Sequence, residues 1–268
     1  MNKLYIDPTG GFAGDMFSAA LISAGADEKK MIEAMEYAAS KIGTANIKTE
    51  KTKDDATRLI IDIKHDHNHL PGHDAKHLIL HIFEELQIKE NFMYFGMVAL
   101  QNLIDAEIKA HKEHTFLTDH HHGHSHSHGH DHHGHHHHHG DEPEAFLHEA
   151  QDILIDITGA VYGLQLLNAE PQAVLTAPVS YGGGMITFSH GTLKVPAPAT
   201  QNMIDKFKLP VKEGPVDFEL FTPTGAAILS ALSPLLENEP TDDNNLSTGT
   251  SRGTKDLDIP PLKVCLKE

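Results

Sequence analysis

The sequence predicts an α/β or α+β fold, in which a mixed sheet with flanking helices carries a disordered His-rich loop. Short apolar segments with the period of strands alternate with longer segments whose apolar residues follow helical spacing. A chain of 268 residues can bury one large core or two small ones. Residues 118–144 contain no apolar side chain to bury. We therefore expect an N-terminal part over 1–117, the His-rich loop over 118–144 and a C-terminal part over 145–268.

The N-terminal part begins with a strand that runs into a glycine-rich turn and a helix. Gly25 ends that helix, and Asp27 is expected to cap the next one. Two strands follow around a polar turn, and then two helices with apolar residues on one face. The predicted elements are a strand over 3–6, helices over 16–24 and 28–41, strands over 46–51 and 58–64, and helices over 74–86 and 92–111.

The C-terminal part begins with a mostly apolar helix in which Gly159 and Gly163 lie four residues apart, which allows close packing against a neighbour. Strands are expected where β-branched residues cluster between glycines and prolines. The predicted elements are helices over 152–167, 199–207 and 226–232, and strands over 173–179, 185–188, 192–195, 219–222 and 262–266.

Charge and composition exclude several classes of protein. The formal net charge is −17, so we expect no nucleic-acid partner. No apolar run approaches the roughly 18 residues that span a bilayer, and the N-terminus has no apolar signal region, so we expect no membrane partner. A single cysteine excludes an internal disulfide framework. A cytoplasmic location is the simplest interpretation.

Fourteen of the 24 histidines lie between positions 120 and 139. Imidazole suits nickel, zinc, copper and iron, so the tract predicts metal binding without naming the metal. A purification tag would sit at a terminus in a uniform run, and a solvated loop without a metal role is the second alternative. The expected ligands are His120, His121, His122, His124, His126, His128, His130, His132, His133, His135, His136, His137, His138 and His139.

The glycine-rich turn lies between Asp7 and Asp15. A strand, a turn and a helix N-terminus together can cradle a phosphate, so Gly10, Gly11 and Gly14 are candidate ligand-binding positions. The two flanking carboxylates can hold a divalent cation. A tight turn capped by Asp15 is the alternative.

A second group of polar residues begins at His148. If the segment is helical, His148, Asp152 and Asp156 share one face at spacings of four residues. Carboxylates on a buried stripe are costly unless they are paired or bind a cation. Glu149 is a candidate base, and an exposed acidic edge is the alternative.

Three further motifs are weaker. Gly182 and Gly183 permit close backbone approach to a ligand, and His190 follows them as a candidate ligand, acid or base. Thr222 or Thr224 is expected to cap a helix whose free amides favour an anion, although a cap alone explains the motif equally well.

His73, His77 and His81 are spaced four residues apart on a predicted helix. One helical face could thus bind a metal through His73 and His77, or the three histidines could form a solvated face. The residue pattern does not separate these two interpretations.

Taken together, these segments resemble the LarC family of nickel insertion proteins. The similar segments are DPTGGFAGDM (7–16), FLHEAQDILIDITGA (146–160), SYGGGMITFSHGTLKVPAPAT (180–200) and ELFTPTGAAIL (219–229). The resemblance extends from about residue 3 to residue 266. The chain departs from the family pattern in a shorter segment between Glu149 and Asp152, and in Pro-Pro-Leu-Lys over 260–263.

The resemblance implies insertion of Ni²⁺ into pyridinium-3,5-bisthiocarboxylic acid mononucleotide, a cyclometallation that consumes CTP and makes the cofactor of lactate racemase-type enzymes. His148, Glu149 and His190 are then candidate bases. Asp7, Asp15, Asp152 and Asp156 would orient nickel, or Mg²⁺ or Mn²⁺ bound to CTP.

The family's C-terminal CTP-binding domain is expected to be absent after Glu268, so a separate C-terminal chain is an expected partner. Self-association is left open. The alternative on the same fold is a non-catalytic protein for nickel storage or delivery, and a zinc-handling protein is a third interpretation.

Overall fold

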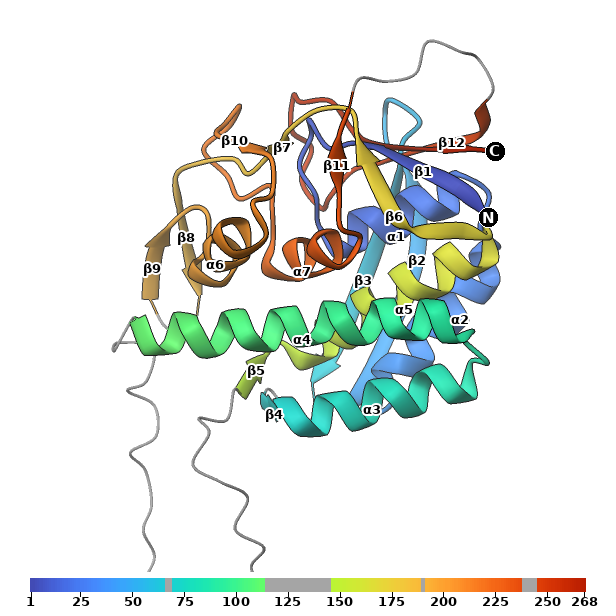
Figure 1. Ribbon diagram of the computed structural model, residues 1–268, viewed down its shortest axis with the longest axis horizontal. Helices are drawn as coiled ribbons and strands as arrows, with labels where there is room; N and C mark the ends of the chain where they lie inside the picture. The colour runs from blue at the N-terminus through green and yellow to red at the C-terminus, as the bar shows by residue number, and fades with distance from the viewer. Residues whose placement is uncertain (66–68, 114–145, 189–190, 238–244) are drawn as a thin grey trace, which may run out of the picture.

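The computed structural model describes residues 1–65, 69–113, 146–188, 191–237 and 245–268 (Figure 1). Within these ranges it is a mixed α/β structure, as predicted, with a seven-stranded sheet in the order β11-β6-β1-β13-β12-β3-β2. The strands are β1 (Asn2–Asp7), β2 (Gly43–Lys51), β3 (Thr57–His65), β6 (Ala169–Leu175), β11 (Leu235–Leu236), β12 (Asn245–Ser251) and β13 (Leu262–Lys267). The helices are α1 (Gly14–Ser23), α2 (Glu28–Ala39), α3 (Gly72–Glu85), α4 (Glu90–Glu113), α5 (Ala150–Leu166), α6 (Pro198–Phe207) and α7 (Pro223–Ala231).

Strand β1 lies near the middle of the sheet because both of its edges are paired. It runs antiparallel to β13, with Tyr5 opposite Cys265, and parallel to β6. Leu4 and Ile6 are buried on the face that the helices cover. The glycine-rich turn therefore leaves the sheet at the carboxyl end of β1, where ligand sites of parallel α/β sheets commonly form.

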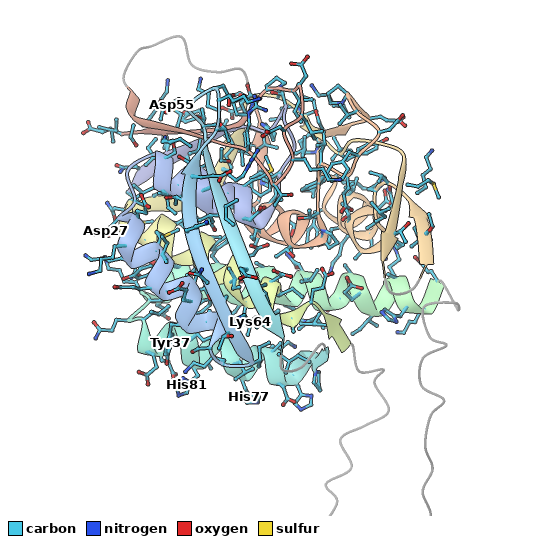
Figure 2. The ribbon with its side chains drawn as sticks, turned by 180° about the vertical axis from the view of Figure 1, so that it is seen from behind. Asp27, Tyr37, Asp55, Lys64, His77 and His81 are labelled. Atoms are coloured by element: carbon cyan, nitrogen blue, oxygen red, sulfur yellow. The ribbon has the colours of Figure 1, made fainter. Side chains whose placement is uncertain are left out.

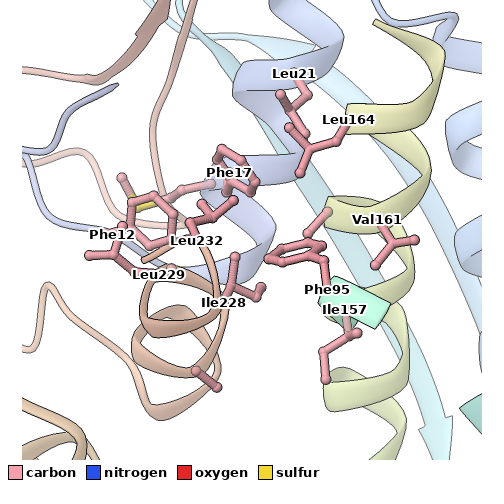
Figure 3. Packing of buried hydrophobic residues seen from close by; sticks show 14 of the residues in the cluster. Phe12, Phe17, Leu21, Phe95, Ile157, Val161, Leu164, Ile228, Leu229 and Leu232 are labelled. Atoms are coloured by element: carbon pink, nitrogen blue, oxygen red, sulfur yellow. The ribbon is translucent and has the colours of Figure 1, made fainter. Parts of the chain in front are cut away.

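Two layers of helices pack against the sheet. Helix α1 contacts β3 and β12, and α5 packs on α1 and α2. Helix α4 crosses α5, α6 and α7 (Figure 1). Figure 3 shows Phe17 of α1, Val161 of α5 and Phe95 of α4 in the shared core. Full burial of one such side chain stabilises the fold by roughly 1.5–3 kcal/mol.

The predicted close packing of α5 is confirmed. A Cβ at Gly159 would collide with the Ser18 hydroxyl, and one at Gly163 would lie 2.7 Å from Leu21 Cδ1. The predicted cap of α2 is also present, because the Asp27 side chain accepts a hydrogen bond from the Lys30 amide at 3.0 Å.

Three short strand pairs lie outside the main sheet. They are β4 (His69–Pro71) with β5 (Phe146–His148), β7 (Val179–Ser180) with β10 (Val211–Lys212), and β8 (Met185–Phe188) with β9 (Gly191–Lys194). Strand β5 packs beside α4, which ends at Glu113. Among the described helices, none is long and apolar enough to cross a bilayer.

Two predicted strands are wrong in detail. The strand expected over 173–179 is divided, because β6 ends at Leu175 and β7 starts only after Pro178, which has no amide hydrogen to donate. The strand expected over 219–222 is replaced by isolated bridges, in which Glu219 pairs with Gly182 and Phe221 pairs with Phe12. Strand β12 was missed because its sequence, NLSTGTS, is mostly polar.

Candidate functional site

The glycine-rich turn is tightly packed against its own chain. The Thr9 amide donates a hydrogen bond to Asp7 Oδ1 at 3.0 Å, so the Asp7 carboxylate holds the turn together. Gly11 has a φ of +97°. A Cβ at Gly10 would collide with the Pro260 carbonyl, and one at Gly11 with Leu220. Packing alone thus requires glycine at positions 10 and 11, and their contact with a phosphate stays a prediction.

Asp15 of α1 and Asp156 of α5 bring two carboxyl groups together. Burial raises the pKa of Asp156 well above its ordinary value, and the charges of Asp15 and Asp152 raise this pKa further. Burial also raises the pKa of Asp15, although hydrogen bonds from backbone amides, including that of Met16 at 2.7 Å, oppose the rise. Two like charges in a buried site favour retention of a proton by the pair. Gly14 is required here because the Asp156 carboxyl occupies the space beside it.

The predicted helical stripe starting at His148 is wrong. His148 ends β5, and α5 begins only at Ala150. Between them, Glu149 has a φ of +56°, in the left-handed region, so the chain turns sharply there. The backbone of His148 therefore belongs to a strand, whereas Asp152 and Asp156 lie on the helix. Glu149 is exposed.

A cavity of about 190 Å³ opens beside the turn. This is smaller than the roughly 300–1,000 Å³ of sites that enclose a whole drug-sized ligand, so it can take part of one. Asp15 and Glu219 both line it. The other lining residues are Gly10, Ala13, Met16, Phe218, Leu220, Thr222, Ser251, Arg252, Gly253, Thr254, Lys255, Leu257, Ile259, Pro260 and Pro261.

Two cations line the cavity from the segment between β12 and β13. The Arg252 guanidinium forms a bidentate pair with Asp54 and donates to the carbonyls of Leu257 and Ile259, so it holds the cavity wall. The Lys255 ammonium lies 3.5 Å from the centroid of the Phe218 ring. Among the described residues, no carboxylate lies within ion-pair distance of this ammonium, which leaves it available to an anion.

Glu219 is a carboxylate whose role the sequence did not suggest. It is half-buried, and burial followed by the charge of Glu149 raises its pKa to about 7, although the Ala197 amide donates a hydrogen bond that opposes the rise. Its Oε1 is buried and has no hydrogen-bond partner among the described residues. Glu107 on α4 also has a pKa of about 7 from burial and Glu149, but it does not line the cavity.

The remaining motif glycines pack closely against other segments, and Thr222 caps a helix. A Cβ at Gly182 would collide with the Phe218 carbonyl, and one at Gly183 would lie 3.3 Å from Asp217 Oδ1. The cap of α7 is Thr222, whose hydroxyl accepts a hydrogen bond from the Gly225 amide at 3.1 Å. Thr222 also lines the cavity, whereas Thr224 does not.

The predicted metal-binding histidines are not brought to this cavity by the described structure. His190 and the tract from His120 to His139 lie outside the described residues. His73, His77 and His81 are exposed on α3, and Figure 2 shows His77 and His81 on its outer side. In the part of the chain that the structure describes, no three His, Cys, Asp or Glu side chains are placed to hold one metal ion. The metal-binding role of His73 and His77 stays a prediction.

Sequence reasoning missed Glu219 and Lys255 for different reasons. Glu219 is the first residue of the segment ELFTPTGAAIL, three residues before Thr222, so its place in that segment was the available signal. Lys255 lies in a polar segment without periodicity, and only the folded connection between β12 and β13 brings it to the cavity.

Comparison with known proteins identifies the family of this chain. The family model described as nickel insertion protein matches residues 4–126 and 133–268. A putative nickel insertion protein of Dictyoglomus thermophilum is 29% identical over 271 residues, covering 98% of this chain and 59% of the relative. A pyridinium-3,5-bisthiocarboxylic acid mononucleotide nickel insertion protein of Thermotoga sp. is 30% identical over 281 residues, covering 97% of this chain and 60% of the relative.

A protein of Staphylococcus saprophyticus with the same name as the Thermotoga relative is 29% identical over 263 residues, covering 97% of this chain and 58% of the relative. No solved structure matches the chain. The chain thus spans at most 60% of the length of these three relatives. Since the family model covers nearly all of it, the chain belongs to the nickel insertion protein family.

Proposed function

We propose that this chain carries out the nickel-inserting step on pyridinium-3,5-bisthiocarboxylic acid mononucleotide, producing the nickel-pincer nucleotide cofactor of lactate racemase-type enzymes. The names of the Thermotoga and Staphylococcus relatives support this substrate. The observation that carries the proposal is the cavity that both Asp15 and Lys255 line, with Asp156 beside Asp15. Such a site offers carboxylates to a cation and an ammonium to an anion.

The two kinds of charge suit the two ends of the substrate. Lys255 is assigned to the phosphate of the mononucleotide, because its ammonium has no carboxylate partner among the described residues and lies at the cavity. Asp15 and Asp156 are assigned to the arriving Ni²⁺, which would displace the proton that the pair retains. Asp152 adds negative charge beside them, and Asp7 keeps the turn in place.

The reaction replaces a proton by Ni²⁺ on one carbon of the pyridinium ring. A carbon–hydrogen bond breaks, a carbon–nickel bond forms, and nickel remains divalent, so a base must take one proton. His148, Glu149 and His190 are candidates from the sequence. The His tract from His120 to His139, with His73 and His77, would supply nickel to the site.

CTP is proposed as a co-substrate, with Mg²⁺ or Mn²⁺, held by a separate C-terminal chain. This part of the proposal depends on the family resemblance and on the length that the relatives have beyond the matched region. The described cavity is too small for a second whole nucleotide.

Incubation of the protein with Ni²⁺, CTP, Mg²⁺ and the dithiocarboxylated pyridinium mononucleotide tests the proposal. It is run with and without a supplied C-terminal region of a relative, and mass spectrometry counts metallated product against protein. The expected result is product in at least one of the two arms. Tight nickel binding without product in either arm would instead support the storage and delivery alternative, which the fourteen tract histidines favour.

Lys255→Gln tests the phosphate assignment separately. We expect its Kd for the mononucleotide, measured by calorimetry, to rise about tenfold, since a charged hydrogen bond contributes roughly 1.5–3 kcal/mol when buried and less at an exposed site. Lys212→Gln is the matched control, because Lys212 is exposed on β10 and does not line the cavity. Equal affinities for the two variants would remove Lys255 from the site.

A further inference from the structure

We infer that Asp54 is a positioning residue for mononucleotide binding, because it fixes, through Arg252, the cavity wall that carries Lys255. This inference rests on the proposed function, in which Lys255 binds the phosphate, and adds a residue to it. Asp54 lies in the turn between β2 and β3 and does not line the cavity. Arg252, which does, lies 198 residues further along the chain.

The cavity wall around Lys255 has little backbone support of its own. Residues 252–261 connect β12 to β13 without forming a helix or a strand, and eight of the 17 residues that line the cavity lie in this connection. The Arg252 amide donates a hydrogen bond to the Thr57 carbonyl at 3.0 Å. Among the described residues, no further backbone–backbone hydrogen bond is found for residues 253–261. The position of this wall therefore depends on side-chain contacts.

The Arg252 guanidinium closes the connection on itself. Its Nη1 donates hydrogen bonds to the carbonyl oxygens of Leu257, at 3.2 Å, and Ile259, at 2.7 Å, and both of these residues line the cavity. A guanidinium is a rigid planar fork, so these two bonds fix Leu257 and Ile259 relative to Arg252. Lys255 lies within the loop that these bonds close.

Asp54 holds the other side of the same guanidinium. Arg252 Nε donates to both Asp54 oxygens at 2.9 Å, and Arg252 Nη2 donates to Asp54 Oδ2 at 2.6 Å. The Thr52 hydroxyl donates to Asp54 Oδ1 at 2.7 Å and so orients the carboxylate. The Arg252 side chain is only 17% exposed. A bidentate, charge-assisted contact of this kind adds geometric constraint as well as energy, which is what a positioning role requires.

A second ion pair holds the connection directly after Lys255. Arg58 Nη2, on β3, donates to Asp256 Oδ1 at 2.5 Å. Both pairs join the connection to the hairpin of β2 and β3, so loss of one pair should shift the wall without releasing it. A shift of the wall moves Lys255, and a binding group that is no longer held in place binds its ligand more weakly.

Asp54→Asn tests the inference through the Kd for the mononucleotide, measured by calorimetry at pH 7. We expect a rise of about three- to tenfold, because the neutral amide keeps the size of the side chain but weakens the hydrogen bonds from Arg252. Asp54→Glu, which restores the carboxylate, should recover part of the affinity. Asp55→Asn is the matched control, since Asp55 is the next residue in the same turn and pairs with Lys51 instead of Arg252. Its Kd should equal that of the wild type.

A double variant distinguishes positioning from a general structural effect. If Asp54 acts through Lys255, then Asp54→Asn combined with Lys255→Gln should bind the mononucleotide only as weakly as Lys255→Gln alone, about tenfold less tightly than the wild type. Independent effects would multiply instead. In the insertion assay, Asp54→Asn should raise the KM for the mononucleotide and leave the rate at saturating mononucleotide unchanged.

The failure of this inference differs from the failure of the proposed function. If Lys255→Gln weakens binding but Asp54→Asn does not, the inference is overturned and the proposed function stands. Multiplied effects in the double variant also overturn it, because Asp54 would then act by a route other than Lys255. If Lys255→Gln binds as the wild type does, the phosphate assignment fails and the inference falls with it.

Discussion

The carboxyl group of Asp156 on α5 occupies the space into which a side chain at position 14 on α1 would project. Gly14 and Asp156 are thus complementary, one by lacking a Cβ and the other by filling the gap. This contact couples the first helix to the fifth at the point where Asp15 enters the cavity. The packing of α1 against α5 and the charge of the site therefore depend on the same pair of residues.

Gly14→Ala should destabilise the protein by about 1–3 kcal/mol, because the new methyl group forces the Asp156 carboxyl out of its position. The free energy of unfolding in urea measures the effect. Gly253→Ala is the control, since the nearest atom to a Cβ there is Met16 Sδ at 3.4 Å, an ordinary contact. If Gly14→Ala and Gly253→Ala are equally stable, the close fit between Gly14 and Asp156 is contradicted.

Asp156→Asn should stabilise the protein at pH 7. The folded-state pKa of Asp156 is raised above 3.8, so ionisation favours the unfolded chain and the wild type loses stability as pH rises from about 4 through the folded-state pKa. The variant lacks the titration, so we expect it to be more stable than the wild type at pH 7 and no more stable at pH 3.

Asp54→Asn should change the pH dependence of the unfolding free energy in the opposite direction, measured by the same urea unfolding. Hydrogen bonds from Arg252 and Thr52 lower the pKa of Asp54, so its contribution is present above the ordinary value and is lost as pH falls. Its substitution should therefore reduce stability at neutral pH and not at low pH. If Asp156→Asn and the wild type are equally stable at every pH, then ionising Asp156 costs no free energy in the folded protein.

Much of this fold could be predicted because its elements carry local signals. Asp27 and Thr222 are good helix caps by residue type, and both cap in the structure. The apolar spacing of α3, α4 and α5 likewise places each helix to within a few residues. Strand β12 could not be found in this way, because its partners, β13 and β3, supply its stability and its own side chains are mainly polar.

The candidate site was only partly predictable for a similar reason. Asp15 and Asp156 belong to short motifs with carboxylates in unusual places, and each was named. Their mutual contact, and the arrival of Glu219 and Lys255 at one cavity, depend on the packing of segments up to about 240 residues apart. The assumption of one continuous helix misplaced His148, because no residue pattern announces the left-handed turn at Glu149.

Thr222→Ala should cost about 1 kcal/mol through loss of the cap of α7. The hydroxyl of Thr222 accepts from the Gly225 amide, and a methyl group leaves that amide without this partner. Thr222→Ser should retain most of the stability. Thr224→Ala is the comparison, since Thr224 does not cap the helix; thermal unfolding that ranks Thr224→Ala below Thr222→Ala would reverse the assignment.

Deletion of residues 120–139 should lower the number of bound nickel ions and leave the free energy of unfolding within about 0.5 kcal/mol of the full chain. The deletion removes fourteen histidines. Equilibrium dialysis gives the stoichiometry, and urea unfolding without metal gives the stability. Replacement of the segment by a Gly/Ser sequence of equal length is the control for chain length. A large loss of stability in both variants would mean that the tract supports the fold.

The contact between α4 and β5 has a kinetic consequence. Helix α4 ends at Glu113 before the His-rich segment, and β5 begins at Phe146 after it. These two flanking elements contact each other. The charge of Glu149, which follows β5 directly, raises the pKa of Glu219, a residue that lines the cavity. Under the proposed function, transfer of an ion from a loaded tract to the cavity of the same molecule is a first-order event, whose rate does not depend on the concentration of the protein.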